Sequence, residues 1–335
     1  MEAADVNLQR KTLAMLKVLE AAGRPMGSAA LSRALYDWGI DLRERMVRNY
    51  LARTDAAGLT VNLGRRGRTI TELGQRELRL GVAIDRVGFV ANRVDELAYR
   101  MTFDGREEAG TVIVNCTLVR TNLPLHEVLW EIRAVFDAQL GMGRRLMVLT
   151  REPNPLHIAI PPGHFALATV CSVTLNGIML RRGIAMTSRF GGLLEMEQAR
   201  PVRFRHLISY DGSTLDPLEV FIKGKMTSVR KTARTGTGVI GASFREIPQV
   251  ALADAMAVVR GLTRVGLGGV LLVGKPNQPL LDVPVSPGRV GMVVAGGLNA
   301  IAALEEIGLS TESTALHSLC EMRRLQGIEE LLRGA

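Results

Sequence analysis

The sequence predicts an α+β protein: an N-terminal winged helix-turn-helix followed by an internally duplicated α/β sandwich. Three observations lead to this prediction. Residues 41–68 contain an amphipathic helical pattern followed by a basic, glycine-rich hairpin pattern. Residues 85–335 repeat themselves at an offset of about 125 residues. Within each repeat, apolar strand-like runs alternate with helical patterns, which is typical of sheets covered by helices.

The first two elements are predicted to be helices that support the third. Residues 8–22 carry Leu16 and Leu19 on an apolar stripe, and Gly23 ends the helix. A second helix is expected from Ser28, a residue type that caps helices, to just before Gly39. A third is expected from Asp41, which has the spacing of a capping box with Glu44. A fourth is expected to be capped by Thr71 and to run through Leu73, Leu78 and Leu80.

The third helix has two different faces. Its packing face repeats at i, i+3, i+4 and i+7, with Val47, Tyr50, Leu51 and Thr54. The opposite face carries Arg45, Arg48 and Asn49. Arginine and asparagine can pair bidentately with guanine and adenine, so this face is predicted to enter the major groove of DNA.

A basic wing is predicted after this helix. Strand-like residues 59–61 and 69–71 flank Gly64-Arg-Arg-Gly-Arg68, whose arginines would meet the DNA backbone or minor groove. Residues 1–80 hold 14 Lys/Arg against 9 Asp/Glu, more than half of the chain's formal excess of +9. The predicted DNA contacts are Arg43, Arg45, Arg48, Asn49, Arg65, Arg66 and Arg68.

The remainder of the chain is predicted to consist of two similar halves. Residues 140–149 resemble 265–274, and residues 160–163 resemble 285–288. Each half is expected to contain a strand (112–118; 239–244), a helix (126–140; 251–262), a buried strand (146–149; 270–273) and a helix around a Leu-Asn pair (175–176; 298–299). The predicted domains are 1–81 and 82–335, the latter with halves at about 85–208 and 209–335. The interface between the halves would suit a small-ligand pocket.

Several functional classes find no support in the sequence. The three cysteines and five histidines have no metal or disulfide spacing. Gly236–Gly241 matches GxGxxG but follows a basic run instead of an apolar strand, so it is a weak nucleotide signal. No signal peptide or membrane-spanning run is present. We therefore expect a cytoplasmic protein without catalytic activity, metal or cofactor.

Several segments resemble the NrpR family of nitrogen-regulation repressors. Residues 43–51, 64–74 and 85–90 are similar to the start of that family, and residues 183–192, 215–223 and 236–248 are similar to its regulatory domain. The family commonly has Ser-Glu-Arg-Thr-Val-Arg at the start of the reading helix. This chain has Arg43 and Met46 in place of the Ser and Thr.

The resemblance implies 2-oxoglutarate as the effector. A repressor of this kind is expected to be a homodimer, which would place two reading helices on a palindromic operator. A dicarboxylate needs fixed cationic or N–H donors, and the glycine-flanked segments offer Arg189, Thr227, Ser228, Gly238, Ser243 and Arg245. An apolar stripe with Val87, Val90, Val94 and Leu97 predicts a helix that couples the two parts or pairs across the dimer. Two alternatives remain open: a winged-helix module that binds protein or RNA on a scaffold, and a DNA-binding head fused to a metabolic enzyme.

Overall fold

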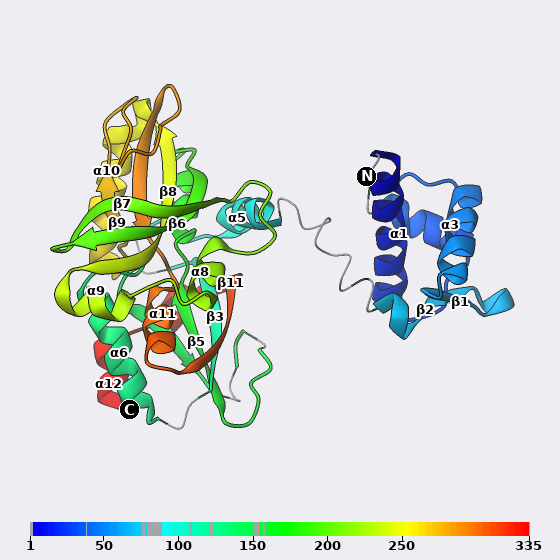
Figure 1. Ribbon diagram of the computed structural model, residues 1–335, viewed down its shortest axis with the longest axis horizontal. Helices are drawn as coiled ribbons and strands as arrows, with labels where there is room; N and C mark the ends of the chain where they lie inside the picture. The colour runs from blue at the N-terminus through cyan, green and yellow to red at the C-terminus, as the bar shows by residue number, and fades with distance from the viewer. Residues whose placement is uncertain are drawn as a thin grey trace. The chain divides into compact units, whose positions relative to one another are not determined.

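The chain forms two compact units, which divide between Val87 and Gly88. We call them the head (up to residue 87) and the body (from residue 88); both are drawn in Figure 1. The computed structural model describes residues 3–37, 39–75, 78, 89–106, 109–120, 123–150, 154–156 and 158–334. No helix within these ranges is long and apolar enough to cross a membrane.

The head has the element order of a winged helix-turn-helix. Its helices are α1 (Ala3–Ala22), α2 (Ser28–Asp37) and α3 (Glu44–Ala56). The wing consists of β1 (Thr60–Asn62), a 3-10 turn (Gly64–Arg66) and β2 (Arg68–Ile70), which pairs antiparallel with β1. Residues 72–75 are helical, and the Thr71 hydroxyl accepts from the Gly74 N–H at 3.0 Å, as the predicted cap requires. The remainder of that predicted helix, apart from Leu78, lies outside the described residues.

The predicted faces of α3 are confirmed. Val47, Leu51 and Thr54 are buried against the core of the head, while Arg45, Arg48 and Asn49 are exposed. Gly67 allows the wing to approach the α1–α2 turn, with φ at +100° and reciprocal backbone bonds of 2.9 Å between Arg68 and Met26. A Cβ on Gly67 would lie 2.4 Å from the Met26 carbonyl, so only glycine fits here.

The start of α3 differs from the prediction. Arg43 occupies the N-cap position without a side-chain cap hydrogen bond, and the helix begins at Glu44. Asp41 lies two residues before this N-cap position, so the predicted capping box of Asp41 and Glu44 does not form. The Glu44 carboxylate instead accepts from the Ser28 hydroxyl at 3.0 Å, which joins the starts of α2 and α3.

The body contains two similar series of elements. The first comprises α5 (Phe89–Arg100), β3 (Thr111–Arg120), α6 (Leu125–Asp137), β4 (Arg145–Leu149), β5 (His164–Val170), α7 (Thr174–Arg181), β6 (Thr187–Glu197) and β7 (Arg200–Ser209). The second comprises α8 (Pro217–Lys223), α9 (Val229–Thr235), β8 (Gly238–Pro248), α10 (Leu252–Leu262), β9 (Val270–Val273), β10 (Arg289–Ala295), α11 (Asn299–Glu306), β11 (Ser310–Glu321), β12 (Gln326–Gly327) and α12 (Ile328–Gly334). These series contain the predicted strands and helices of both halves.

Each sheet of the body takes strands from both halves. The first has the order β11-β3-β5-β4-β12 and the second β7-β6-β8-β10-β9, with antiparallel neighbours. The trio β3, β5, β4 thus corresponds to β8, β10, β9. In each half, the next strand pairs with the trio of the other half: β6, which follows α7, pairs with β8, and β11, which follows α11, pairs with β3. In Figure 1 the orange-red β11 accordingly lies beside β3, from the opposite half of the sequence.

The duplicated glycine segments meet where the halves join. Gly143 forms a bridge with Leu267, and the Arg144 N–H donates to the Gly266 carbonyl at 3.2 Å. Gly143 has φ at +118°, and a Cβ there would lie 2.3 Å from the Gly266 oxygen. The repeated glycines therefore let two equivalent backbone segments touch.

The helices exchange partners between the halves as the strands do. α6 packs closely on α11, and the equivalent pair is α10 with α7, which make far fewer contacts. The internal symmetry is therefore broken, because one helix pair is closed and its counterpart is open. α5 packs on α7 and buries Val90, Val94 and Leu97 inside the body core. Val87, also expected on that stripe, lies outside the described residues.

Candidate nucleic-acid interface and ligand site

The outward face of α3 presents the predicted base-reading groups to solvent. Arg45 and Asn49 are exposed and form no side-chain hydrogen bond or ion pair within the described residues. Arg48 pairs with Glu44 one turn earlier at 3.2 Å, with side chains 62% and 45% exposed. Such an exposed pair contributes only about 0.3–0.5 kcal/mol, so a phosphate or guanine could readily replace Glu44.

The wing arginines divide into two kinds. Arg65 and Arg66 are exposed on the 3-10 turn and, among described residues, have no side-chain partner. Arg68 is half-buried and donates through Nε to Asp55 at 2.7 Å. Asp55 also accepts from the Thr60 hydroxyl, so Arg68 fastens the wing to the end of α3. Arg43 is exposed beside the start of α3, which leaves six of the seven predicted DNA-contact residues open to a partner.

Arg245 and Ser243 lie deep inside the body, on β8. The Arg245 side chain is fully buried and donates to the Ser172 carbonyl at 2.8 Å, the Ser172 hydroxyl at 2.7 Å and the Ser243 hydroxyl at 3.1 Å. It also donates to Asn176 Oδ1. These partners satisfy a buried charge that would otherwise be very unfavourable. The arrangement binds β8 to α7 and leaves Arg245 no access to a ligand from solvent.

The surroundings of Arg245 contain further enclosed polar groups. Burial raises the pKa of Asp216 to about 6, against the opposing effects of the Leu218 and Glu219 N–H groups and the Arg245 charge. Burial also raises the pKa of Tyr210 above its ordinary value. Asp216 caps α8 by accepting from the Leu218 N–H at 2.8 Å. Asp216 therefore has a structural role as the cap of α8.

Thr227 and Ser228 lie at the start of α9, where an internal carboxylate occupies the donors. Glu306 accepts from the Thr227 hydroxyl at 2.8 Å and from the Val229 N–H at 2.7 Å. Gly238 packs against Ser228, whose hydroxyl accepts from the Val239 N–H at 2.8 Å. A ligand carboxylate at these residues would have to displace the carboxylate of Glu306.

Arg189 lies apart from those groups, at a bulge in β6. Its Nη1 donates to both oxygens of the buried Glu246 at 3.1 Å and to the Ser286 hydroxyl at 2.8 Å. It lines a hollow of about 270 Å³ that also contains Asp95 and Asp211. The six predicted ligand residues therefore do not form one site, and the hollow beside Arg189 carries more negative than positive charge.

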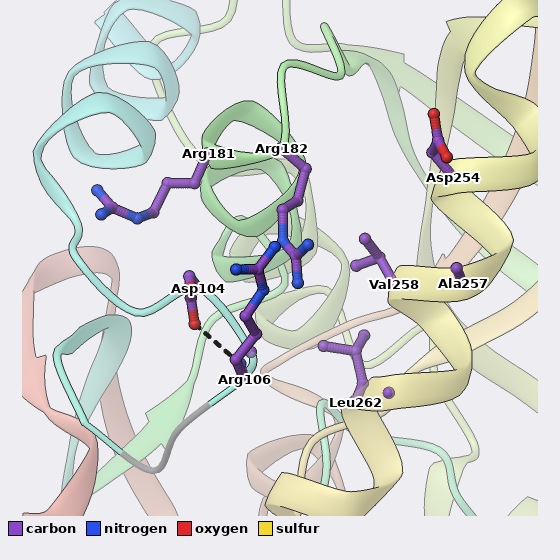
Figure 2. A pocket seen from close by; sticks show the side chains of 10 residues that line it. Asp104, Arg106, Arg181, Arg182, Asp254, Ala257, Val258 and Leu262 are labelled. Atoms are coloured by element: carbon purple, nitrogen blue, oxygen red, sulfur yellow. Dashed lines mark hydrogen bonds between the residues drawn. The ribbon is translucent and has the colours of Figure 1, made fainter.

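A larger hollow opens between α7 and α10, the loosely packed helix pair. It measures about 440 Å³ and is lined by three arginines (Arg106, Arg181 and Arg182), two aspartates (Asp104 and Asp254) and a wall of small or apolar α10 residues (Ala257, Val258, Gly261 and Leu262), with Gly105. In Figure 2, Arg106 and Arg182 extend into this space, whereas Arg181 points away from α10. Arg181 donates to the Met101 carbonyl at 3.4 Å, at the end of α5.

Sequence reasoning did not find this hollow. Arg106 follows α5, the Arg181–Arg182 pair ends α7, and the opposite wall comes from α10, so no local motif joins them. The duplication was the one sequence signal that could have indicated it. Equivalent helix pairs in the two halves can pack unequally, and the looser pair then leaves a hollow. Within the described residues, no cluster of potential metal ligands occurs.

The head and body together define a class of protein: a transcriptional regulator with a winged-helix head and a separate α+β regulatory body. Residues 87–327 match the profile of the NrpR regulatory domains NRD1 and 2, and residues 13–78 match that of the ribonuclease R winged-helix domain. The chain is 33% identical to the global nitrogen regulator NrpRI of Methanosarcina mazei over 324 residues, which cover 97% of this chain and 99% of that protein. The chain belongs to the NrpR family of nitrogen regulators.

Two other relatives agree with this assignment. The global nitrogen regulator NrpR of Methanococcus maripaludis is 28% identical over 93% of this chain, which spans 54% of that relative. The crystal structure of a nitrogen repressor-like protein from Methanococcus jannaschii superposes with a TM-score of 0.59 at 26% identity. It covers 72% of this chain and 98% of its own. The relatives are named as regulators and not as enzymes.

Proposed function

We propose that the protein is a DNA-binding repressor of nitrogen-assimilation genes that 2-oxoglutarate releases from its operator. The observation that carries the DNA-binding part is the unpaired, exposed set of Arg45, Asn49, Arg65 and Arg66, on a packed helix and its wing. Nucleic-acid binding needs cations that can exchange water for phosphate, and these groups have no internal partner among the described residues.

The proposed repressor acts as a homodimer. One α3 helix can read only a few base pairs, and two related by a twofold axis read half-sites about one helical turn apart. A palindromic operator is the DNA counterpart of that symmetry. Met46, 43% exposed on the outward side of α3, adds an apolar group that suits a thymine methyl.

The proposed route of control runs through α5, the first helix of the body. α5 is fixed to the body by its buried stripe and by Arg93, which donates to the Leu316 and His317 carbonyls of β11 at 3.3 and 3.0 Å. The chain enters α5 from the head, so a change in α5 placement alters the constraint on the head. An effector shifts this equilibrium only if it binds two arrangements of the body with different affinities.

The test is duplex binding by the purified full chain, measured by fluorescence anisotropy at several stated salt concentrations with and without 2-oxoglutarate. A duplex selected from random sequences serves as operator, and a scrambled duplex as control. We expect salt-sensitive binding that favours the operator and weakens as 2-oxoglutarate is added. Succinate and glutamate are the matched anions.

Each part of the proposal can fail separately. Absence of salt-sensitive duplex binding would remove the repressor and favour a protein- or RNA-binding head. Duplex binding that ignores 2-oxoglutarate would keep the DNA-binding protein and remove the effector.

A further inference from the structure

We propose that the hollow between α7 and α10 is the effector site, and that a small dicarboxylate binds there between the Arg106 and Arg182 guanidinium groups. The identity of the ligand rests on the proposed function, whereas the location rests on the structure of the body. Neither the predicted ligand residues nor the matches with related proteins point to this place.

The first argument is the broken internal symmetry. α6 and α11 pack closely, and the equivalent pair α10 and α7 leaves a hollow of about 440 Å³. This volume falls within the range of small-ligand pockets, roughly 300–1,000 Å³. The two helix pairs are equivalent by the duplication, yet only α6 and α11 pack closely, while α7 and α10 stay open.

The second argument is charge. Arg106 and Arg182 both line the hollow and are exposed, and neither side chain has an ion-pair partner within the described residues. The carboxylates of Asp104 and Asp254 also line it, but neither forms an ion pair with these arginines among the described residues. Two guanidinium groups that share one space repel each other unless an anion lies between them. Each can hold a carboxylate through paired N–H groups, so two arginines match the two ends of a dicarboxylate.

The third argument is the shape of the opposite wall. Ala257, Val258 and Gly261 recur at i, i+1 and i+4 on α10 and present small groups to the hollow. A Cβ on Gly261 would meet nothing within 4 Å, so this wall has room for a short carbon chain. Asp104 is held by the loop itself, accepting from the Arg106 N–H at 2.8 Å.

The position of Arg106 gives the site a regulatory consequence. The loop of residues 101–106 follows α5 directly, and Arg181 holds its start through the Met101 carbonyl. An anion drawn between Arg106 and Arg182 would pull this loop toward the end of α7. The same displacement acts on α5, which receives the chain from the head.

The experiment is isothermal titration of 2-oxoglutarate into the full chain and three variants. Arg106→Ala/Arg182→Ala removes both guanidinium groups. Ala257→Glu keeps them and places a carboxylate in the hollow from an exposed position of α10. The control, Arg260→Ala/Arg264→Ala, removes two positive charges from exposed residues at and beyond the end of α10 that do not line the hollow.

We expect the parent and the control to bind alike, and the affinity of the Arg106→Ala/Arg182→Ala variant to fall about 100-fold. Ala257→Glu should weaken binding at least as much, and both hollow variants should still bind duplex but resist release by 2-oxoglutarate. Parent-like affinity in both hollow variants would overturn the site while leaving the proposed function standing. A parent chain that does not bind 2-oxoglutarate would instead remove the effector, and the site with it.

Discussion

The head and the body use arginine in opposite ways. On α3 and the wing, Arg45, Arg65 and Arg66 stand in solvent without an internal partner among the described residues. In the body, Arg245 is fully buried and donates to several groups of its own chain. The first arrangement keeps a charge available for exchange with a partner. In the second arrangement, the charge of Arg245 binds β8 to α7 inside the protein. An arginine in a functional region therefore need not touch a ligand.

The strongest test of this contrast removes the buried guanidinium. Arg245→Ala should lower the free energy of unfolding by about 4 kcal/mol, because it leaves a cavity and unpaired oxygens at Ser172 and Asn176. Arg245→Met fills most of the volume without a charge and should lose much less. Urea unfolding followed by circular dichroism gives both values. Equal stability of the alanine variant and the parent would show that the network contributes little.

A second test addresses the enclosed carboxyl of Asp216. Its pKa is raised to about 6, so the folded body binds this proton more tightly than the unfolded chain does. Stability from this group is therefore present below about pH 4, declines as pH rises to about 6 and is constant above. Asp216→Asn keeps a capping side chain and should remove that decline, leaving the variant more stable at pH 7 by at most about 3 kcal/mol. Thermal melts from pH 4 to 8 test it, and parallel curves for variant and parent would refute it.

A third test examines the outward face of α3, which is predicted to read bases. Arg48→Ala/Asn49→Ala should reduce discrimination between the selected and scrambled duplexes by about 1–3 kcal/mol for each base pair read, with the fold unchanged. Arg53→Ala, exposed in the last turn of the same helix, is the matched control. Discrimination that survives the double change would place base reading elsewhere on the head.

The smallest expected effects separate the two kinds of wing arginine. Arg66→Ala should weaken binding to all duplexes about equally and lower the salt slope by about 1, without changing head stability. Arg68→Ala should lower head stability by about 1 kcal/mol, because Asp55 loses its half-buried partner. Duplex binding of both variants is measured by fluorescence anisotropy as a function of salt, and their stability by thermal melts. If Arg66→Ala lowered stability and Arg68→Ala weakened binding instead, the two roles would be reversed.

The head was predictable because its signals are local. The i, i+3, i+4, i+7 pattern places Val47 and Leu51 inside, and consequently Arg45 and Asn49 outside, whatever the tertiary context. What failed there depended on contacts across the chain. The pairing of Glu44 with Ser28 replaced the expected capping box, and the ion pair of Arg68 with Asp55 was not foreseen. The DNA contact of Arg68 stays a prediction.

The body was predictable in its elements but not in how the predicted ligand residues are arranged. The duplication identified equivalent strands and helices, since each is a short apolar run with its own period. It did not indicate which sheet a strand joins, and so could not show that Arg245 faces Ser172 and Asn176 of the other half. The ligand residues were predicted from their donor groups. Glu246 and Glu306, at distant positions in the sequence, already accept from two of them, Arg189 and Thr227.

The exchange of β6 and β11 bears on the ancestry of the body. A single half on its own would have a three-stranded sheet with an unpaired edge at β3 or β8. The strand that follows in the same half does not pair with that edge. That edge is filled only by the corresponding strand of another half. A solitary ancestor of the repeat would thus have formed an interlocked pair with a second copy of itself. Fusion of two copies of the gene would then have joined this pair in one polypeptide. The two equivalent helix pairs could then diverge, so that α6 and α11 pack closely while α7 and α10 leave a hollow.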